Sequence, residues 1–292
     1  MTNTIRLANS QYSLTLRPNV PSAVDPFFVT DSELHFPAVR VDQYQRTGRT
    51  GVDDFTGFFD NGIFTANLKV QDVAGTTRHQ NVDILRALCA PGAGTQLFIQ
   101  RDGWLTERWA NVRGDTFSCV IDNKSRVILN VAMQLSLPDG ILQDTVQQLR
   151  VLIPLGLNVG RIYSATQKFY PWNYSLGSSA FASTVVSNGS TPVLPILRYY
   201  GAFTNPTIKN VTTGKSLSLT GLSLTDGQYI DINTAKRTIY LNSDPSLSYY
   251  SYLNFATSTW WALVPGSNLI SATAATVDTS ASVSIIWYDG WV

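Results

Sequence analysis

The sequence predicts a mainly β protein, and three observations support this prediction. Charged residues make up 14% of the 292 residues, and Glu33 and Glu107 are the only glutamates, so good helix formers are scarce. Serine, threonine, asparagine, glycine and aromatic residues are abundant instead, and they favour strands and turns. From Pro192 onward, short apolar alternations are interrupted by turn residues every ~8–12 positions, as is typical of an all-β sandwich.

Length and composition also limit the classes of protein. A chain of 292 residues suggests two domains, each able to bury a core. The formal net charge of +1 indicates neither a polyanion-binding surface nor an acidic tail. We expect no signal peptide and no membrane span, because no basic start with an apolar core and no run of ~18 apolar residues is present. Cys89 and Cys119 are the only cysteines, and we expect both to be reduced and buried.

Apolar alternation predicts the first strands. We expect them within residues 5–17, 34–41 and 63–70. Prolines predict a loop or an edge segment at residues 18–26. One helix is expected at residues 79–89, with Asp83 in its first turn and with one apolar stripe formed by Val82, Leu85 and Leu88.

Turn residues divide the segment after this helix. Pro91–Gly92 should end the helix, and Asp102–Gly103, Asp122–Asn123 and Pro138–Gly140 should each join two strands. Residues 141–157 are ambiguous. Ile141, Val146 and Leu149 have helical spacing, whereas Val151, Ile153 and Leu155 alternate, so we favour a strand for the second half only.

The second half of the chain has the clearest strand pattern. The runs YIDIN and TIYLN, separated by residues 234–237, predict a hairpin in which Ile230 and Ile232 share one face. The last ten residues also alternate, which places Val283, Ile285 and Trp287 on one side.

The order of these pieces resembles the C-terminal, galectin-like domain of siphophage distal tail proteins, the Dit family. The matching features are Gly201, Asn205–Pro206, the run IKNVTTGKSL, the hairpin through Asp231 and Arg237, the turn at Pro265–Asn268 and the final strand with Trp287 and Tyr288. Asn233 departs from the pattern, because an aspartate is more usual there. The first 160 residues resemble the family's tail-tube-like domain, on element order alone: a β-barrel or β-sandwich with one flanking α-helix.

The resemblance and a shift in composition predict the domain organisation. Only ten charged residues lie from Pro195 onward. We expect a ring-forming belt domain at residues 1–165, a linker at 166–194 and a galectin-like β-sandwich at 195–292. The aromatic stretch Arg161–Tyr174 bridges the halves.

Two segments are candidate subunit interfaces. Residues 45–60 combine glycines, arginines, aspartates and phenylalanines, and either form an ordinary long hairpin or an arm that docks on a neighbouring subunit through its aromatic residues. The second candidate is the bridge between the halves. The candidate interface residues are Arg46, Arg49, Phe55, Phe58, Phe59, Tyr170 and Trp172.

The sequence contains no convincing catalytic, metal or cofactor site. His35 and His79 lie far apart and away from the cysteines, and no CxxC, HExxH, G-x-S-x-G or nucleotide-binding glycine pattern occurs. The adjacent aspartates Asp53 and Asp54, with Asp60, leave open a weak calcium site or a carboxylate pair, but such loop aspartates usually form turns. We therefore expect no enzyme activity and no cofactor.

The family resemblance implies a structural virion protein. Such a protein is a homo-hexameric ring at the tail tip, assembled in the host cytoplasm, that contacts the tail tube protein, the tape-measure protein, the hub or tip protein and receptor-binding proteins, and through which DNA passes. One alternative is a carbohydrate-binding adsorption protein in which Trp260 or Trp261 stacks on sugars; extended backbone would bury one of the two. The other is a tail-tube protein with an added domain.

Overall fold

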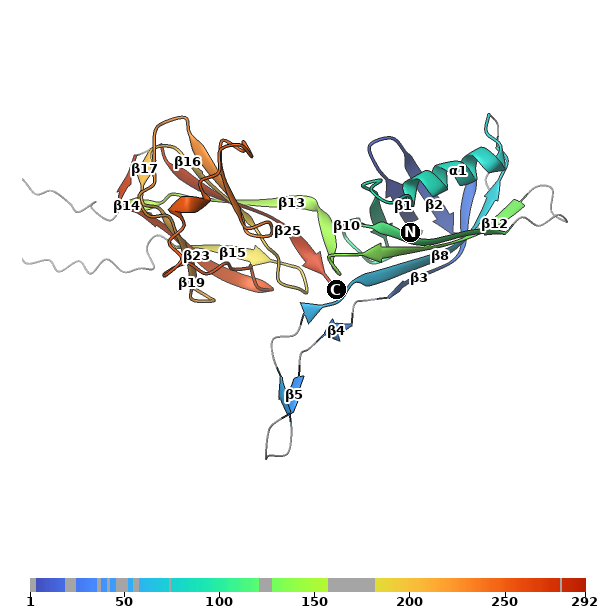
Figure 1. Cartoon of the computed structure of the whole chain (residues 1–292), viewed down its shortest axis with the longest axis horizontal. Coiled ribbons are helices and arrows are strands. Elements are labelled where there is room, and N and C mark those ends of the chain that lie inside the picture. The colour runs from blue at the N-terminus through green and yellow to red at the C-terminus, as the bar shows by residue number, and fades with distance from the viewer. Residues whose placement is uncertain are drawn as a thin grey trace, which may run out of the picture. The chain divides into compact units, whose positions relative to one another are not determined.

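The computed structural model describes residues 4–18, 25–35, 38–40, 43–45, 52–54, 58–73, 75–120, 128–156, 182–278 and 280–292 (Figure 1). The chain divides into two compact units. The first comprises Met1–Thr145 together with Trp291–Val292, and the second comprises Val146–Gly290. The described residues are mainly strands with one α-helix, so the predicted fold class is confirmed.

The first unit is built on an open sheet. Its strands, in spatial order, are β11 (Arg113–Val120), β12 (Ile128–Leu137), β8 (Gly62–Gln71), β3 (Phe27–His35), β2 (Ser13–Pro18), β1 (Thr4–Ala8), β9 (Gln96–Gln100), β10 (Arg108–Asn111) and the beginning of β13 (Leu142–Leu152). Neighbouring strands are antiparallel, except that β2 and β3 are parallel. Within the described residues no strand pairing closes this sheet into a barrel.

Period-two alternation explains how the sheet buries one face. Along β8 every second side chain is buried, including Phe64, Leu68 and Val70. Ile5 and Leu7 of β1 join the same hydrophobic cluster. Successive side chains of a strand point to opposite faces, so the sequence pattern alone selects the face that packs against the core.

Helix α1 (Arg78–Leu88) covers that core. Val82, Leu85 and Leu88 are buried, as predicted, and α1 lies against β8, β11 and β12 (Figure 1). The prediction for Asp83 is wrong, because the first turn contains no acidic residue. A capping box supplies the start signal instead: Gln80 N–H donates to Thr77 Oγ1, and the Gln80 side chain accepts from Thr77 N–H.

Two strand predictions need correction. The strand expected at residues 34–41 begins at Phe27, because Phe27–Val70 to His35–Ile63 form a ladder with β8. Residues 142–152 form one continuous strand, so their helical alternative is wrong. The hydrogen-bonded partner of its first residues is β10, with Trp109 opposite Gln143; a long-range partner of this kind overrides weak helical spacing. The expected turn at Asp122–Asn123 lies outside the described residues.

The second unit is a β-sandwich. One layer contains the end of β13, β25 (Ser282–Trp291), β16 (Ile196–Tyr200), β21 (Tyr229–Asn233) and β22 (Thr238–Leu241). The other contains β14 (Leu155–Gly156), β15 (Ala182–Ser187), β23 (Gly266–Ala274), β18 (Thr207–Asn210) and β19 (Lys215–Ser218), and a small sheet contains β17 (Phe203–Thr204), β20 (Ser223–Leu224) and β24 (Thr276–Val277). Buried residues from both layers form one core.

The hairpin predicted in this unit is confirmed. Ile230 pairs with Leu241 and Ile232 with Ile239, and all four side chains are buried. The predicted alternation of β25 is also confirmed, because Val283, Ile285 and Trp287 belong to the core.

The predicted domain boundaries stay a prediction, because residues 157–181 lie outside the described part of the chain. Residues 182–187, which the sequence placed in the linker, form β15 and pair with β23. Strand β13 carries the chain from the first unit into the second.

Candidate functional site

The predicted interface residues are mostly outside the described part of the chain. This holds for Arg46, Arg49, Phe55, Tyr170 and Trp172. Phe58 and Phe59 form β7 (Phe58–Phe59), whose backbone pairs with β4 (Val39–Arg40). The interface assignment therefore stays a prediction for all seven residues.

The backbone around the predicted arm is a pair of two-stranded ladders. Strands β4 and β7 pair with each other, and β5 (Gln43–Gln45) pairs with β6 (Val52–Asp54) (Figure 1). Among the described strands these four form sheets separate from the main sheet. A hairpin of two strands alone is marginally stable in water, so this segment would gain stability from a partner surface.

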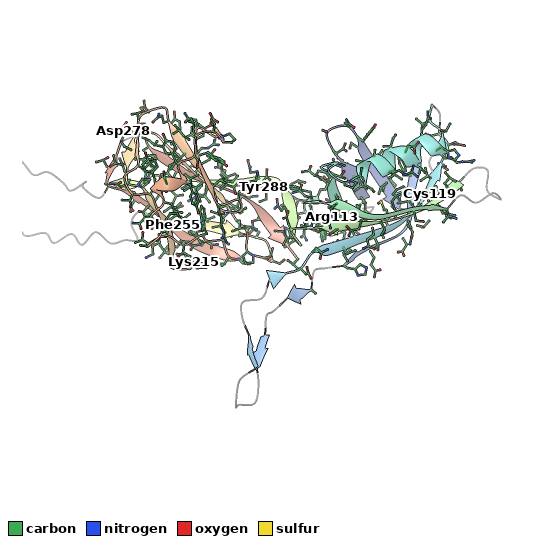
Figure 2. All side chains as sticks on the ribbon, viewed as in Figure 1. Arg113, Cys119, Lys215, Phe255, Asp278 and Tyr288 are labelled. Carbon is green, nitrogen blue, oxygen red and sulfur yellow. The ribbon has the colours of Figure 1, made fainter. Side chains whose placement is uncertain are left out.

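The main sheet of the first unit has one edge at β11. This eight-residue strand pairs with β12 on one side and is the last strand of the sheet in the described chain. The outer edge of such a strand presents backbone N–H and C=O groups that can pair with another chain. Arg113 lies at the beginning of this strand and Cys119 near its end (Figure 2).

A second edge lies along β3. Within the described residues, β2 pairs with β3 only at Phe28 and Val29, whereas β8 continues to pair with β3 as far as His35. The stretch from Thr30 to His35 thus has a described partner strand on one side only. Five of its six residues, Thr30–Glu33 and His35, are exposed.

The face of the β11–β12–β8 sheet opposite α1 is polar. The exposed or half-buried side chains of its central rows are Thr116, Ser118, Asn130, Ala132, Gln134, Thr65, Asn67 and Lys69, whereas Arg113, Val120, Ile63 and Ile128 lie at the strand ends of the same face. Cross-strand neighbours on this face, such as Ser118, Ala132 and Asn67, come from three successive strands. Lys69 is the one charged residue of the central rows, so this part of the face offers hydroxyl and amide groups rather than a strong electrostatic field.

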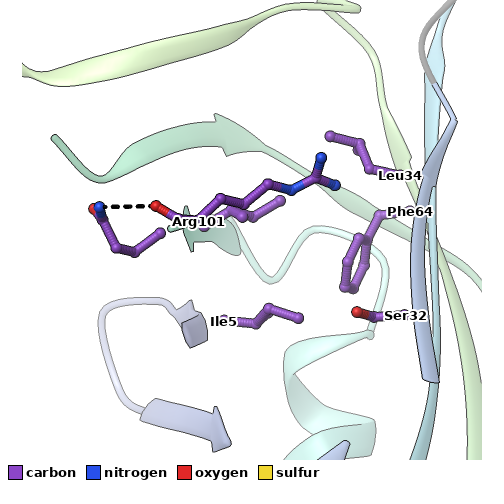
Figure 3. Close-up of a pocket in the computed structure, with 7 residues that line it drawn as sticks. Ile5, Ser32, Leu34, Phe64 and Arg101 are labelled. Carbon is purple, nitrogen blue, oxygen red and sulfur yellow. Dashed lines mark hydrogen bonds between the residues drawn. The ribbon is translucent and has the colours of Figure 1, made fainter. Parts of the chain in front are cut away.

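A pocket of about 250 Å³ opens beside the β3 edge (Figure 3). It is lined by Ile5, Ser32, Leu34, Phe64, Ile99, Gln100 and Arg101. The Arg101 side chain extends toward Leu34, and Gln100 Nε2 donates to the Arg101 carbonyl oxygen at 3.4 Å (Figure 3). The lining combines apolar side chains from β1, β3, β8 and β9 with one cationic side chain, that of Arg101. It lacks the pair of titratable groups that acid–base chemistry needs.

A cation–π stack holds the last residues of the chain to the first unit. The Arg108 guanidinium carbon lies 3.9 Å from the ring centroid of Trp104 and 3.8 Å from that of Trp291. Burial lowers the pKa of Arg108, and the nearby Asp144 carboxylate opposes that effect. This contact could not be predicted from the sequence, because Arg108 and Trp291 are far apart along the chain and only the fold brings them together.

Within the residues that the structure describes, the titratable side chains do not assemble into a catalytic or metal site. His35 Nε2 lies 3.4 Å from Glu33 Oε2, both exposed, and Asp60 Oδ1 accepts a hydrogen bond from Asn61 N–H. The side chains of Asp53 and Asp54 lie outside the described residues. In the part that the structure describes, no group of three or more His, Cys, Asp and Glu could hold a metal ion, and no helix could span a membrane.

The tryptophans of the second unit have different environments. Trp287 and Trp261 are buried in the core, as expected for one of the adjacent pair, and Trp260 is half-buried against that core. Trp260 therefore remains the tryptophan available at the surface in this part of the chain.

Comparison with known proteins identifies the second unit. Residues 188–291 match the family described as siphovirus-type tail component, C-terminal domain. The match lies almost entirely within the second unit. The resemblance to the distal tail (Dit) family seen in the sequence is thereby confirmed, and with it a structural role in the siphophage tail.

Solved structures extend this likeness to the fold of the whole chain. The crystal structure of the Dit protein (gp 19.1) of SPP1, described as a paradigm of the hub adsorption apparatus in phages that infect Gram-positive bacteria, is 11% identical, and the match covers 99% of each chain with a TM-score of 0.63. The phage P2 baseplate in its activated conformation, with Ca and with Sr, matches at 10% identity over 98% of each chain with a TM-score of 0.45. No curated protein matches the chain.

Proposed function

We propose that this protein is the hub at the distal end of a siphophage tail, where a hexameric ring of copies joins the tail tube to the tail tip or baseplate. Residues 188–291 match the tail component family, and the whole chain has the fold of a Dit protein. The ring, its copy number and its neighbours are inferences that build on these two similarities.

The two edges of the first unit carry the proposal. A closed ring of identical subunits uses heterologous contacts, so each copy needs two different and complementary patches. The outer edge of β11 and the edge of β3 from Thr30 to His35 are two such patches on one sheet. Pairing β11 of one copy with β3 of the next would satisfy the backbone groups of both edges and would continue the sheet around the ring.

The arm supports the same arrangement. The ladders β4–β7 and β5–β6 are separate from the main sheet in the described residues, and a lone hairpin gains stability when it packs on another surface. We infer that the segment containing Arg46, Arg49, Phe55, Phe58 and Phe59 reaches an adjacent copy, and that the bridge with Tyr170 and Trp172 contributes a second contact.

The polar face of the β11–β12–β8 sheet is suited to the inside of such a ring. A wall rich in lysine and arginine would bind DNA through its phosphates and slow its passage. The described face instead carries hydroxyl and amide groups with Lys69 as its one cation in the central rows. We infer that DNA and the tape-measure protein pass this face, and that the ring acts without catalysis or a cofactor.

A crosslinking experiment tests the edge contact. Thr116 and Glu33 are exposed and lie in one cross-strand row of the sheet, through Gln134 and Thr65. In a Cys119→Ser background, the double variant Thr116→Cys/Glu33→Cys treated with a short bismaleimide should give a covalent ladder up to a hexamer. Either single variant should give no ladder beyond a dimer.

Mass measurement in solution separates the two parts of the proposal. The uncrosslinked protein should have the mass of six 32.1 kDa copies, whereas a tail-tube protein would form polymers of increasing length. A monomer would overturn the ring. A hexamer without a crosslinked ladder would retain the ring and overturn the β11–β3 contact.

A further inference from the structure

The second unit carries a strongly exposed aromatic side chain, Phe255. Phe255 is 67% exposed, more than any other aromatic side chain that the structure describes (Figure 2). Its ring centroid lies 5.7 Å from that of Tyr250, and the Tyr250 ring is nearly parallel to that of Trp260, at 6.4 Å and 13°. The three rings form a row, which we call the Phe255 row.

One end of the Phe255 row is fixed to the core. Tyr250 and Trp260 are half-buried and pack against the hydrophobic cluster of the second unit. Tyr250 begins a short 3-10 helix (Tyr250–Tyr252). The row therefore leads from buried aromatic surface to a ring that faces solvent, and Phe255 is its free end.

Hydrogen bonds hold the loop that carries Phe255. Asn254 N–H donates to Ser218 O at 2.9 Å, Thr259 N–H donates to Ser216 O at 2.7 Å, and both acceptors belong to β19. Within the loop, Thr257 and Ser258 N–H both donate to Asn254 O. Phe255 is therefore exposed on a loop whose backbone is held by hydrogen bonds. Binding a ligand there would cost little free energy for ordering the loop.

The loop that carries Phe255 is rich in neutral hydrogen-bonding groups. Residues 245–260 contain no Asp, Glu, Lys, Arg or His, but they contain six serines and threonines. Asn254 Nδ2 donates to Thr220 Oγ1 at 3.3 Å, and Ser216 Oγ donates to Thr257 O at 3.1 Å. Lys215 is the one charged residue of β19. A strongly charged ligand would find few counter-charges in this loop.

We propose that the Phe255 row is a binding platform for a neutral saccharide. A pyranose has one face of C–H groups, which packs on the electron-rich face of an aromatic ring, and a rim of hydroxyls, which pair with neutral donors and acceptors. The Phe255 row would supply the ring, and serine, threonine and asparagine side chains of the same loop would supply partners for the rim.

The small apolar area favours a saccharide over a protein partner. Among residues 240–260, Leu247 and Phe255 are the large apolar side chains that are exposed. A protein interface usually needs a contiguous patch with several anchors, whereas a sugar ring needs one aromatic face. This inference extends beyond the proposed hub function and does not depend on it. Where a ring of copies exists, repeated weak sites would add avidity.

Affinity electrophoresis of the full chain tests the platform. Native gels would contain a soluble glucan, galactan, mannan or rhamnan, with polygalacturonate as the charged counterpart. We expect at least one neutral polysaccharide to retard the protein. Phe255→Ala should raise the dissociation constant for this polysaccharide about tenfold, because the variant loses one ring-stacking contact.

Matched variants separate stacking from general apolar contact. Phe255→Trp should retain binding, and Phe255→Leu should lose it, because leucine keeps apolar surface without a ring. Tyr200→Ala removes another exposed aromatic side chain of the same unit (43% exposed) and should bind like the wild type. Since Phe255 is exposed, its variants should keep the unfolding temperature of the wild type.

The platform would be overturned if no neutral polysaccharide retarded the protein, or if polygalacturonate alone did. Unchanged binding by Phe255→Ala, or full binding by Phe255→Leu, would also overturn it. Loss of tail assembly in Phe255→Ala without retardation of the wild type would assign the row to a protein neighbour and also overturn it. Oligomeric mass is a separate readout, so this result and the failure of the hub proposal can be distinguished.

Discussion

Arg198 and Asp231 face each other across strands β16 and β21 and form a bidentate ion pair. Arg198 Nε donates to Asp231 Oδ1 at 2.6 Å, and Nη2 donates to Oδ2 at 2.9 Å. The Ser243 hydroxyl also donates to Asp231 Oδ2, and the Arg198 guanidinium carbon lies 4.5 Å from the ring centroid of Tyr229. The hydrogen bond to Asp231 raises the pKa of Arg198. The pair fixes the register of the two strands.

We expect Asp231→Asn to lower the free energy of unfolding by about 1 kcal/mol, because Arg198 is partly screened by solvent. Its side chain is 39% exposed. Arg198→Lys should have a similar effect, since lysine cannot form the two parallel hydrogen bonds. Urea unfolding of both variants measures this, with the exposed Asp226→Asn as the control. Equal stability of Asp231→Asn and the control would contradict the prediction.

Asp289 is a buried carboxylate held by four hydrogen bonds. Trp287 Nε1 donates to Oδ1 at 3.0 Å, and the other donors are Ser187 Oγ, Asn188 N and Asn188 Nδ2. Asp289→Ala leaves these donors unpaired, so we expect a loss on the order of 3 kcal/mol in unfolding free energy. Thermal unfolding monitored by tryptophan fluorescence would measure it, and a loss under about 1 kcal/mol would be too small for this network.

Tyr199 gives the opposite expectation. Its side chain is buried in the core of the second unit, where burial raises its pKa, and its hydroxyl has no hydrogen-bond partner among the described residues. Tyr199→Phe removes this hydroxyl and keeps the ring that contacts Phe203 at 5.2 Å between centroids. We expect stability to be unchanged or higher by about 1 kcal/mol in chemical unfolding. A clear loss of stability would show that the hydroxyl has a partner.

The two cysteines should differ in reactivity. Both are free; Cys89 is buried, as predicted, whereas Cys119 is half-exposed. Burial raises the pKa of the Cys89 thiol from 9.0 to about 11. Because the thiolate is the reactive form, iodoacetamide at pH 8 should modify Cys119 and leave Cys89 intact in the folded protein, as peptide mass analysis would show. Modification of Cys89 at the same rate as Cys119 would contradict its burial.

The same shift predicts a dependence of stability on pH. In the unfolded chain the thiol ionises near pH 9, whereas in the folded protein it stays neutral to about pH 11. The contribution of Cys89 to stability is therefore complete below pH 9 and is lost as the pH rises toward 11. Cys89→Ala should flatten this part of the stability curve, and Cys119→Ala should leave it unchanged.

The arm gives a prediction about assembly. Deleting residues 46–59 should yield a folded but monomeric protein, because the segment would dock on a neighbouring copy rather than on its own core. Light scattering measures the mass, and circular dichroism confirms that the strands remain. A hexamer after the deletion would rule the arm out as an interface.

Local chemistry explains which parts of the fold could be predicted. The alternation of YIDIN and TIYLN and the stripe of Val82, Leu85 and Leu88 express the periods of strand and helix directly, so these elements were predictable. Residues 27–35 and 142–152 were predicted only in part, because their strands are defined by partners 28 or more positions away along the chain. The capping box was readable in the sequence, because a threonine at position 77 is followed three residues later by a glutamine.

The candidate sites were less predictable than the fold. The sequence marked Trp260 and Trp261 equally, and only packing showed that Trp261 is buried and that Trp260 belongs to the Phe255 row. Phe255 itself lies in an ordinary polar loop sequence. Its exposure follows from hydrogen bonds to Ser216 and Ser218, which are distant along the chain.

The sequence by itself determined that the protein is built of strands with one amphipathic helix, that its second half has the order of a siphophage tail component, and that catalytic motifs are missing. These features are periodicities, turn residues and spacings, and they can be seen in neighbouring residues without knowledge of long-range contacts. The tertiary structure decided which strands became edges, which aromatic residues reached the surface, and how Arg198 meets Asp231 and Arg108 meets Trp291. Such contacts depend on the register of strands far apart in the chain, and a one-residue change in register would place every side chain on the other face.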